Sequence, residues 1–309
     1  MDQVAKAIED ATGAGNSDLA LAKINLALHV LAERPDGYHD LESLVVFADV
    51  ADVVTARPAA KGGAATTLDV TGPYAGALQE TTAPSANLAL RAAQAITATA
   101  ARRRAKPMHL SLAKRIPIAA GLGGGSADAA ATLRLLDRLW GLGLKPDKLA
   151  EIAQKLGADV PMCLVSQPLL ARGIGELVTP VSGIPALSVV LAHPGISVPT
   201  GAVFAGLGKE VRSPLPPLPS KFKSALDLVF WLRQTRNDLI DPARVVSRQA
   251  AAAAKALTSD PDCLFARMSG SGAAAFGIFV KPAAAERAAE RLKAAKPDWW
   301  VTAAMTGGS

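Results

Sequence analysis

Aromatic side chains are scarce in this chain of 309 residues, where they make up 4% of the sequence. Proteins that bind single-stranded nucleic acid use aromatic rings as stacking platforms, so this composition argues against that class. The net charge of +6 and the basic run Arg102–Arg104 with Lys106 are the features in favour of it. A modest positive charge equally suits an enzyme whose substrates are polyanions. We therefore expect no nucleic-acid partner.

Cysteine is nearly absent, because only Cys163 and Cys263 occur and each lies among apolar neighbours. Two isolated cysteines argue against a disulfide framework and against a zinc site. They predict buried thiols in a reducing compartment, and hence a cytoplasmic protein.

Long apolar runs are also missing. Half of the residues are hydrophobic, but no unbroken apolar stretch is long enough to span a bilayer, so we expect no membrane partner. Met1–Asp18 mixes charges of both signs without an apolar segment, which is not typical of a secretory signal. We expect residues 1–18 to form a flexible extension. The length of the chain allows two domains.

Glycine, in contrast, is concentrated in the run PIAAGLGGGSADAA at residues 117–130. Its four glycines, at 121 and 123–125, let successive backbone N–H groups turn toward one point, because glycine adopts positive φ without a steric penalty. A helix predicted from Ser126 to Trp140, with Ser126 as its N-cap, adds first-turn amides that favour an anion. The run therefore predicts a phosphate cradle, with a nucleoside triphosphate as the expected ligand.

Two other interpretations of the glycine run are a plain turn between a strand and a helix and a Rossmann dinucleotide loop. A plain turn gains nothing from four glycines, which cost conformational entropy and pack no core. A Rossmann loop normally lies near the N-terminus, whereas more than a hundred residues precede this one. A Walker A loop would carry a lysine after its last glycine.

The spacing of apolar residues predicts the main secondary structure. Strands are expected at residues 19–34 and 41–55, joined by the turn residues Arg34-Pro-Asp-Gly37. The other expected strands are 66–70, 108–114 and 187–193, and the expected helices are 87–101, 126–140, 146–156, 242–257 and 283–296. Residues 213–220 are rich in proline and predict an exposed connection. Residues 265–280 contain a second glycine loop, which leads into an apolar strand.

Three motifs occur along the chain in a characteristic order: a first strand that contains Lys23, the glycine run, and RMSGSGA at 267–273. This order resembles the GHMP kinase superfamily, which includes galactokinase, homoserine kinase and mevalonate kinase. The resemblance implies an α+β fold of two-layer α/β sandwiches. A ribosomal-S5-domain-2-like ATP-binding domain is expected at 1–180 and a ferredoxin-like domain that contributes to substrate binding at 181–309. ATP as co-substrate, and Mg²⁺ between its β- and γ-phosphates, are implied with it.

Four shorter motifs are similar to one branch of that superfamily: AKIN at 22–25, RPDGYH at 34–39, GADVP at 157–161 and HPGISVPT at 193–200. Members of this branch phosphorylate a tertiary hydroxyl on the methylerythritol part of a cytidine diphosphate conjugate, in the non-mevalonate (MEP) route to isoprenoids. The resemblance implies that reaction here, in a monomer or weak homodimer. Two alternatives are a small-molecule kinase of the homoserine or mevalonate type and a non-catalytic nucleotide-binding regulator of the same fold.

The resemblance assigns catalysis to Lys23 and Asp159. In the family the matching aspartate takes the hydroxyl proton, and the matching lysine keeps that carboxylate ionised. The sequence supports a partner for Asp159 independently, because it begins an apolar segment where an unpaired carboxylate is costly. Taken singly, each residue is more typical of a solvated charge.

The resemblance also assigns substrate contacts. Tyr38 stacks on the cytosine, His39 bonds to its edge and Phe204 closes the other face. Asn25 and Thr200 reach the diphosphate and methylerythritol portions. The second glycine loop (Ser269, Gly270, Ser271 and Gly272) suits the transferred phosphoryl group or the substrate diphosphate, although a tight turn has the same sequence. A core role is the alternative for Phe204.

The expected ATP-binding residues are Pro117, Gly121, Leu122, Gly123, Gly124, Gly125, Ser126, Ala127, Asn87 and Lys114. Asn87 is equally the predicted N-cap of its helix, and Lys114 equally an exposed charge. Ser126 is the protein oxygen that we place nearest to Mg²⁺. Asp128 is interpreted as a partner of the helix dipole in the first turn.

Overall fold

The computed structural model describes residues 15–60, 65–100 and 105–308. The basic run Arg102–Arg104 and residues 1–14 of the expected extension lie outside this range. Within the described residues, the chain forms two compact units. Unit 1 is made of the residues up to Ala22, Val50–Ile118 and Gly123–Val165, and unit 2 of Lys23–Asp49, Ala119–Leu122 and the residues from Ser166 onward. The expected boundary at 180 falls inside unit 2, because two long strands and the glycine run each contribute residues to both units.

Unit 1 combines a small sheet with a group of helices. Its strands are the first part of β1 (Ser17–Glu33), the last part of β2 (His39–Pro58), β3 (Thr67–Thr71) and β4 (Met108–Ala113). β4 pairs antiparallel with β2 and parallel with β3. The helical elements are α2 (Ala75–Thr81), the short 3-10 turn η1 (Pro84–Ala86), α3 (Leu88–Thr99), α4 (Gly124–Trp140), α5 (Pro146–Leu156) and α6 (Val160–Val165).

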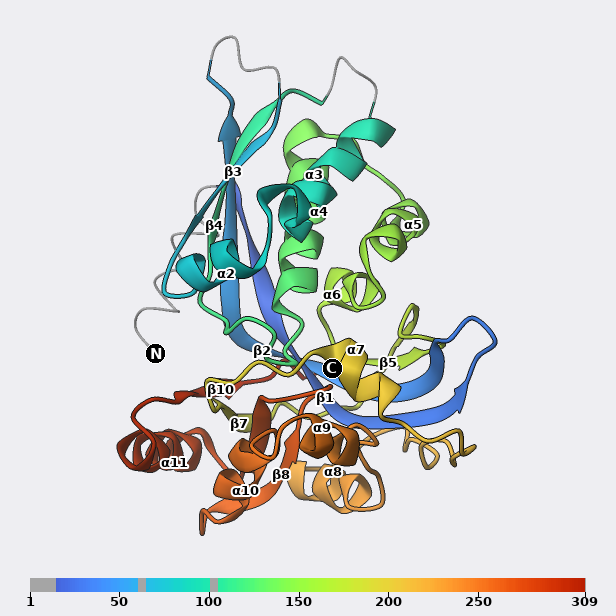
Figure 1. Cartoon of the computed structure of the whole chain (residues 1–309), viewed down its shortest axis with the longest axis vertical. Coiled ribbons are helices and arrows are strands. Elements are labelled where there is room, and N and C mark those ends of the chain that lie inside the picture. The colour runs from blue at the N-terminus through green and yellow to red at the C-terminus, as the bar shows by residue number, and fades with distance from the viewer. Residues whose placement is uncertain (1–14, 61–64, 101–104, 309) are drawn as a thin grey trace. The chain divides into compact units, whose positions relative to one another are not determined.

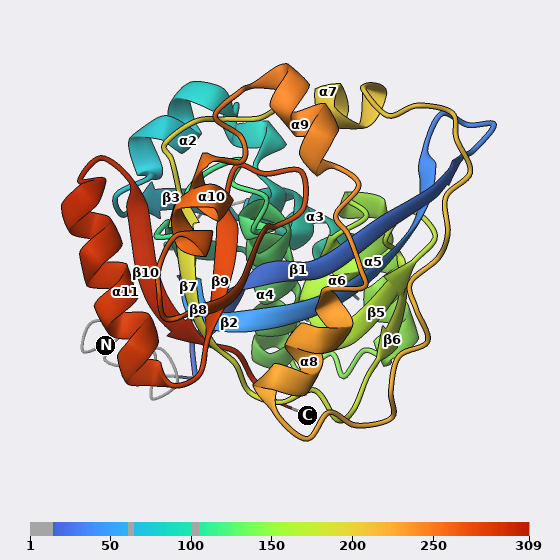
Figure 2. The ribbon, with the colours of Figure 1, turned by 90° about the horizontal axis from the view of Figure 1, so that it is seen from below.

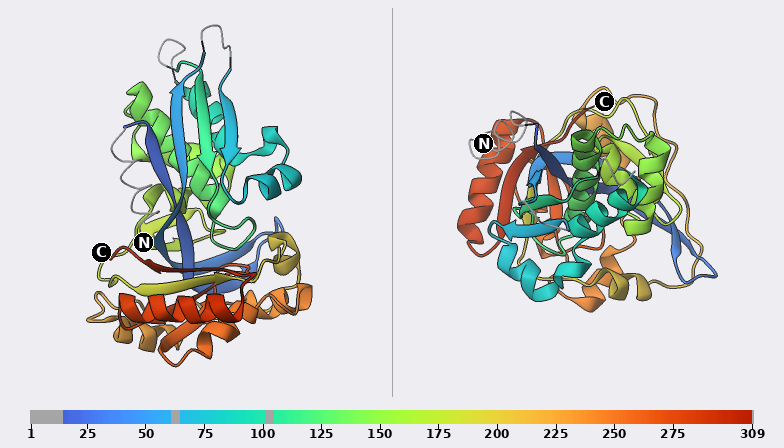
Figure 3. Two further views of the ribbon diagram at one scale, coloured as in Figure 1. Left: turned by 90° about the vertical axis from the view of Figure 1, so that its left-hand side faces the viewer. Right: turned by 90° about the horizontal axis from the view of Figure 1, so that it is seen from above.

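Helix α4 is the centre of unit 1, where it contacts α3, α5 and α6 (Figure 1). Its buried face is rich in alanine, including Ala127 and Ala129–Ala131, and α3 buries Ala89, Ala92 and Ala93. These small side chains let the two helices approach closely while they still exclude water. Helices α3, α4 and α5 lie on one side of the β2–β4–β3 sheet (Figures 1 and 3).

Unit 2 begins with the β1–β2 hairpin, whose turn is closed by hydrogen bonds from Arg34 N to Tyr38 O and from Gly37 N to Arg34 O. β2 pairs antiparallel with β5 (Leu169–Arg172), which in turn pairs antiparallel with β6 (Leu177–Pro180). A second sheet has the antiparallel order β10-β7-β9-β8, built from β7 (Ser188–His193), β8 (Cys263–Met268), β9 (Ala275–Phe279) and β10 (Trp300–Met305). The helices of unit 2 are α7 (Thr200–Ala205), α8 (Ala225–Leu232), α9 (Ile240–Val246), α10 (Ala252–Thr258) and α11 (Pro282–Ala295).

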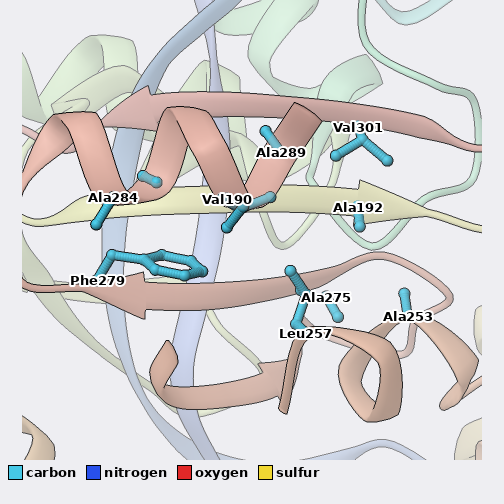
Figure 4. Packing of buried hydrophobic residues seen from close by; sticks show 11 residues of the cluster. Val190, Ala192, Ala253, Leu257, Ala275, Phe279, Ala284, Ala289 and Val301 are labelled. Atoms are coloured by element: carbon cyan, nitrogen blue, oxygen red, sulfur yellow. The ribbon is translucent and has the colours of Figure 1, made fainter. Parts of the chain in front are cut away.

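The core of unit 2 lies between this second sheet and helices α10 and α11 (Figures 3 and 4). Strand residues Val190 and Phe279 face Leu257 of α10 and the alanines of α11, such as Ala284 and Ala289. Because alternate strand residues point to the same face, one apolar face of the sheet is sealed by these two helices. The expected α+β class of two-layer sandwiches is confirmed.

Several sequence predictions are corrected by the structure. Residues 242–257 were expected to form one helix but divide into α9 and α10, because Ser247 is extended (φ −149, ψ 121) and ends α9. The extension expected to reach residue 18 ends earlier, since Asp18 lies in β1 and pairs with Arg134 and Arg138. Both cysteines are free, but Cys263 is only partly buried. Within the described residues, every helix is too short or too polar to cross a membrane.

Candidate active site

The two glycine loops, far apart in sequence, touch each other within unit 2. The Ser269 Oγ hydroxyl donates to Gly121 O (3.1 Å), and Ala274 N donates to Ala120 O (2.9 Å). Gly121 has φ +78, and a Cβ on it would lie 2.5 Å from Ser269 O and 2.9 Å from Gly272 O. Position 121 therefore requires glycine both for its backbone conformation and for the close approach of the second loop.

Replacing Gly121 by alanine is expected to lower the free energy of unfolding by more than the roughly 1–2 kcal/mol that a left-handed conformation costs a non-glycine residue. The matched control is Gly141→Ala, because Gly141 also has positive φ (+57) but nothing lies within 4 Å of its added Cβ. Urea titration of the two variants measures the difference. Equal destabilisation by both changes would mean that the loop contact does not constrain position 121.

The residues expected to hold substrate meet at the second glycine loop. Asn25 N donates to Ser269 Oγ (3.1 Å), and the hydroxyls of Thr200 and Ser271 share a hydrogen bond of 2.8 Å. The Asn25 amide nitrogen donates to Ser43 Oγ (2.7 Å), whereas its Oδ1 is buried without a hydrogen-bond partner among the described residues. A buried unpaired acceptor of this kind is typical of a position that a ligand or an ordered water satisfies.

The tip of the β1–β2 hairpin carries the pair expected to recognise a base. Tyr38 is 59% exposed, which is unusual for an aromatic side chain that serves only packing. The His39 ring lies 5.6 Å from the Phe204 ring, at 44° to it. Phe204 also packs against the apolar cluster that contains Val203 and Leu239. The structure thus brings His39 and Phe204 together, while the roles of all three rings stay predictions.

Helix α4 begins two residues earlier than the sequence predicted. Gly123 is its N-cap in the left-handed conformation (φ 67, ψ 19), and Ala127 N donates to Gly123 O (2.8 Å) to close the first turn. Ser126 is therefore the third helical residue and not the N-cap, because a glycine can start the helix where serine would be strained. The first-turn amides of α4 have no intrahelical acceptor and are suited to an anion.

A buried ion cluster lies beside this helix start. The Lys114 ammonium pairs with Asp128 Oδ2 at 2.8 Å and also contacts Asp52 Oδ2. Asp52 Oδ1 accepts hydrogen bonds from the backbone N–H groups of Arg115 and Ile116. A Cβ on Gly124 would lie 3.3 Å from Lys114 Nζ and 3.6 Å from Asp52 Oδ2. The cluster therefore supports the backbone of the glycine run from inside unit 1.

This cluster corrects two interpretations. Lys114 is not an exposed charge, and Asp128 is a buried partner of Lys114 and not a partner of the helix dipole at the surface. Burial raises the pKa of Asp128 to about 7, although the Lys114 charge opposes the shift. Burial also disfavours the charged form of Lys114, but the two carboxylates outweigh it and raise the pKa of that amine.

Sequence reasoning missed Asp52 altogether. Its one signal was a carboxylate within the run Val50–Val54 of strand β2, where the other four residues are apolar and Asp52 is completely buried. Asn87 is the N-cap of α3, one of the two roles predicted for it, because its Oδ1 accepts a hydrogen bond from Ala89 N (2.9 Å). A contact of Asn87, Pro117 or Lys114 with a nucleotide stays a prediction.

The two residues expected to carry catalysis belong to different units. Lys23, in unit 2, is buried in β1, and its N–H donates to Leu122 O (2.9 Å). Asp159, in unit 1, lies directly before α6, and its carbonyl accepts from Cys163 N (3.2 Å). Neither residue is free of interactions. Their approach to one acceptor hydroxyl stays a prediction.

Comparison with known families agrees with the kinase class that the two glycine loops predicted. Residues 87–167 match the GHMP kinases N terminal domain, and residues 222–298 match the GHMP kinases C terminal domain. The chain belongs to the GHMP kinase family.

Two relatives and one solved structure within that family carry the name of the same enzyme. The 4-diphosphocytidyl-2-C-methyl-D-erythritol kinase of Chelativorans sp. (strain BNC1) is 45% identical over 94% of this chain and 96% of the relative. The enzyme of the same name from Cereibacter sphaeroides (strain ATCC 17025) is 46% identical over 94% of this chain and 98% of the relative. A crystal structure of 4-(cytidine 5'-diphospho)-2C-methyl-D-erythritol kinase superposes with a TM-score of 0.72 at 32% identity, over 95% of this chain and 100% of that one.

Proposed function

We propose that this protein transfers the γ-phosphoryl group of ATP to the 2-hydroxyl of 4-diphosphocytidyl-2-C-methyl-D-erythritol, which yields the 2-phosphate and ADP in the MEP route to isoprenoid precursors. The observation that carries the proposal is 45% identity to an enzyme of that name over 94% of this chain. The contact between the glycine loop at Gly121 and the second loop at Ser269 supports it. Direct phosphoryl transfer needs the two glycine loops to lie near each other.

The residues proposed to bind the acceptor belong to unit 2, and the proposed base, Asp159, belongs to unit 1. Asn25 and Thr200 bind and orient the methylerythritol diphosphate portion, and both contact the second glycine loop. Asp159 accepts the hydroxyl proton, while the Lys23 ammonium steadies the hydroxyl. Phosphoryl transfer proceeds through a loose transition state, so positioning and charge neutralisation account for most of its rate.

The nucleotide side uses the amides of Gly123–Ser126 and the start of α4 to hold the phosphates. Mg²⁺ would supply positive charge that offsets the charge of the nucleotide phosphates, and Ser126 would help to hold it. Magnesium sites on nucleotides commonly take only one or two protein oxygens, with phosphates and water as the other ligands. The half-buried Ser126 fits such a site. No cluster of three or more His, Cys, Asp or Glu side chains suited to a metal occurs within the described residues.

Turnover with defined acceptors tests the proposal. The protein is incubated with Mg-ATP and, separately, with 4-diphosphocytidyl-2-C-methyl-D-erythritol, homoserine or mevalonate, and ADP release is measured. We expect rapid ADP release with the cytidine conjugate only. Turnover with homoserine or mevalonate would support another small-molecule kinase, and ATP binding without turnover of any acceptor would support a non-catalytic regulator.

Tyr38→Ala is expected to raise the KM for the cytidine substrate by about tenfold, because base stacking on an aromatic ring contributes about 1–3 kcal/mol. The KM for ATP should change little, since the proposed stacking is confined to the acceptor. Steady-state kinetics with each substrate varied in turn measures both constants. Tyr74→Ala, at the other tyrosine of the chain, is the control. Equal increases in the two constants for Tyr38→Ala would remove Tyr38 from the base site.

Location and assembly belong to the same proposal. A cytoplasmic location is supported by the two free cysteines and by the use of ATP as a co-substrate. We also predict a monomer or weak homodimer. Its predicted ligands are small molecules, and neither nucleic acid nor a membrane is a predicted partner.

A further inference from the structure

A separate cavity of about 580 Å³ lies in unit 2, lined by the segment after α7 and by residues around the start of α9. Helices α7 and α9 lie side by side there (Figures 1 and 2). One wall is apolar, formed by Leu207, Ile240, Pro242 and Val245. None of the residues proposed to bind substrate lines it, namely Asn25, Tyr38, His39, Thr200, Phe204 and the loop at 269–272. The cavity is thus distinct from the proposed acceptor site.

The cavity lining includes a buried cation, Arg267, that has no anionic partner among the described residues. Arg267 donates to the carbonyl oxygens of Leu26, Leu232 and Thr235 and to Thr235 Oγ1, at 2.8–3.0 Å. Each of these acceptors is neutral. Burial lowers the pKa of Arg267 to about 10, as expected where no carboxylate compensates the charge. Arg267 thus contributes an uncompensated positive charge to the cavity.

The two carboxylates of the cavity already have arginine partners. Asp238 Oδ1 accepts from Arg236 Nε at 2.6 Å, and its Oδ2 accepts from Val30 N at 2.8 Å. The exposed Asp241 pairs with Arg244 at 3.5 Å.

Arg212 is the remaining cation of the cavity. It lies half-buried in the wall, and its guanidinium pairs with no carboxylate among the residues that the structure describes. Arg212 and Arg267 therefore give the cavity a positive potential that an anion can neutralise.

We propose that this cavity binds a small organic anion with a phosphate or diphosphate head and a short apolar group. The guanidinium of Arg212 offers several N–H donors in a planar fork that matches phosphate oxygens. Arg267 adds its charge, because its four Nη hydrogens already bond to the protein. The apolar wall formed by Leu207, Ile240 and Val245 faces the remainder of such a ligand. The volume lies within the range of roughly 300–1,000 Å³ that small-molecule sites have.

The cavity is mechanically linked to the second glycine loop through Asn237. This residue lines the cavity, and its side-chain nitrogen donates to Met268 O (2.9 Å) and Gly270 O (2.8 Å). An occupant of the cavity therefore lies against the residue that holds the loop in place. The proposed site is a neighbour of the loop and not a part of it.

Isothermal titration of the full chain with butyl phosphate tests the site. A saturating non-hydrolysable ATP analogue is present, so that the proposed nucleotide site does not take up the probe. We expect the wild-type chain to bind one equivalent, and Arg212→Gln to bind at least about tenfold more weakly because a charge-assisted contact is lost. Arg248→Gln is the matched control, since Arg248 is exposed and lies outside the cavity. It should bind as the wild type does.

A second variant tests whether weaker binding by Arg212→Gln is an indirect effect of that substitution. Val245→Glu adds a negative charge to the cavity wall at a side chain that is 86% exposed, so it should weaken butyl phosphate binding without unfolding the chain. Absence of binding to the wild type, or equal binding by wild type, Arg212→Gln and Val245→Glu, would overturn the proposal. A failure of the ATP analogue to bind would instead count against the proposed kinase function, because the dependence on Arg212 is measured independently of it.

Discussion

Asp159→Ala is expected to lower kcat for phosphorylation of the cytidine substrate by about 10²- to 10⁴-fold, the range that a positioned general base contributes. ATP should still bind, because the phosphate-binding amides belong to the glycine run and not to the segment around Asp159. ADP release measures turnover, and titration with a fluorescent ATP analogue measures binding.

Asp147→Ala is the matched control for this experiment. Asp147 is also an aspartate near the start of a unit 1 helix, in the first turn of α5, and the proposal gives it no part in the reaction. Turnover of Asp159→Ala comparable to that of the parent would show that Asp159 is not the base. Loss of ATP binding in the same variant would show that the change disturbs the fold or the nucleotide site.

Lys114→Met is expected to lower the free energy of unfolding by about 3–5 kcal/mol, the usual cost of removing one partner from a buried ion pair. The ammonium of Lys114 stands between the carboxylates of Asp52 and Asp128, and all three residues are buried. Methionine fills a similar volume but leaves two carboxylates close together with no cation. Urea denaturation followed by circular dichroism measures the loss.

Two further variants make the ion-pair explanation specific. Lys106→Met, at an exposed lysine just before β4, should change stability by less than about 0.5 kcal/mol. Adding Asp128→Asn to Lys114→Met should restore part of the lost stability, because one of the two unpaired carboxylates is removed. A loss below about 1 kcal/mol for Lys114→Met, or no recovery in the double variant, would contradict this account.

Local sequence signals predicted the secondary structure well where they were strong. Helix α5 runs from Pro146 to Leu156 and is followed by Gly157, as its proline start and glycine end indicated. Strands β1 and β2 follow the apolar alternation on both sides of the Arg34–Gly37 turn. Errors occurred where an irregular residue interrupted the pattern, as at Ser247 between α9 and α10.

The candidate site was predictable only in part. The glycine run, Asn25, Thr200 and the second glycine loop could be named because each carries a local motif, and the motifs together resembled one family. Asp52 could not, because a single carboxylate among apolar neighbours has no recognisable motif. Its importance comes from Lys114 and Asp128, which lie 62 and 76 positions further along the chain.

By itself, the sequence determined the α+β class and the family through the resemblance of its motifs. It also determined the phosphate-binding character of the glycine run, since the backbone freedom of glycine is a local property. Only the tertiary structure decided that Gly121 touches the second loop, that Lys114 is enclosed by two carboxylates, and that Arg212 and Arg267 face one cavity. Those arrangements depend on residues tens to hundreds of positions apart, and the packing of separate elements brings them together.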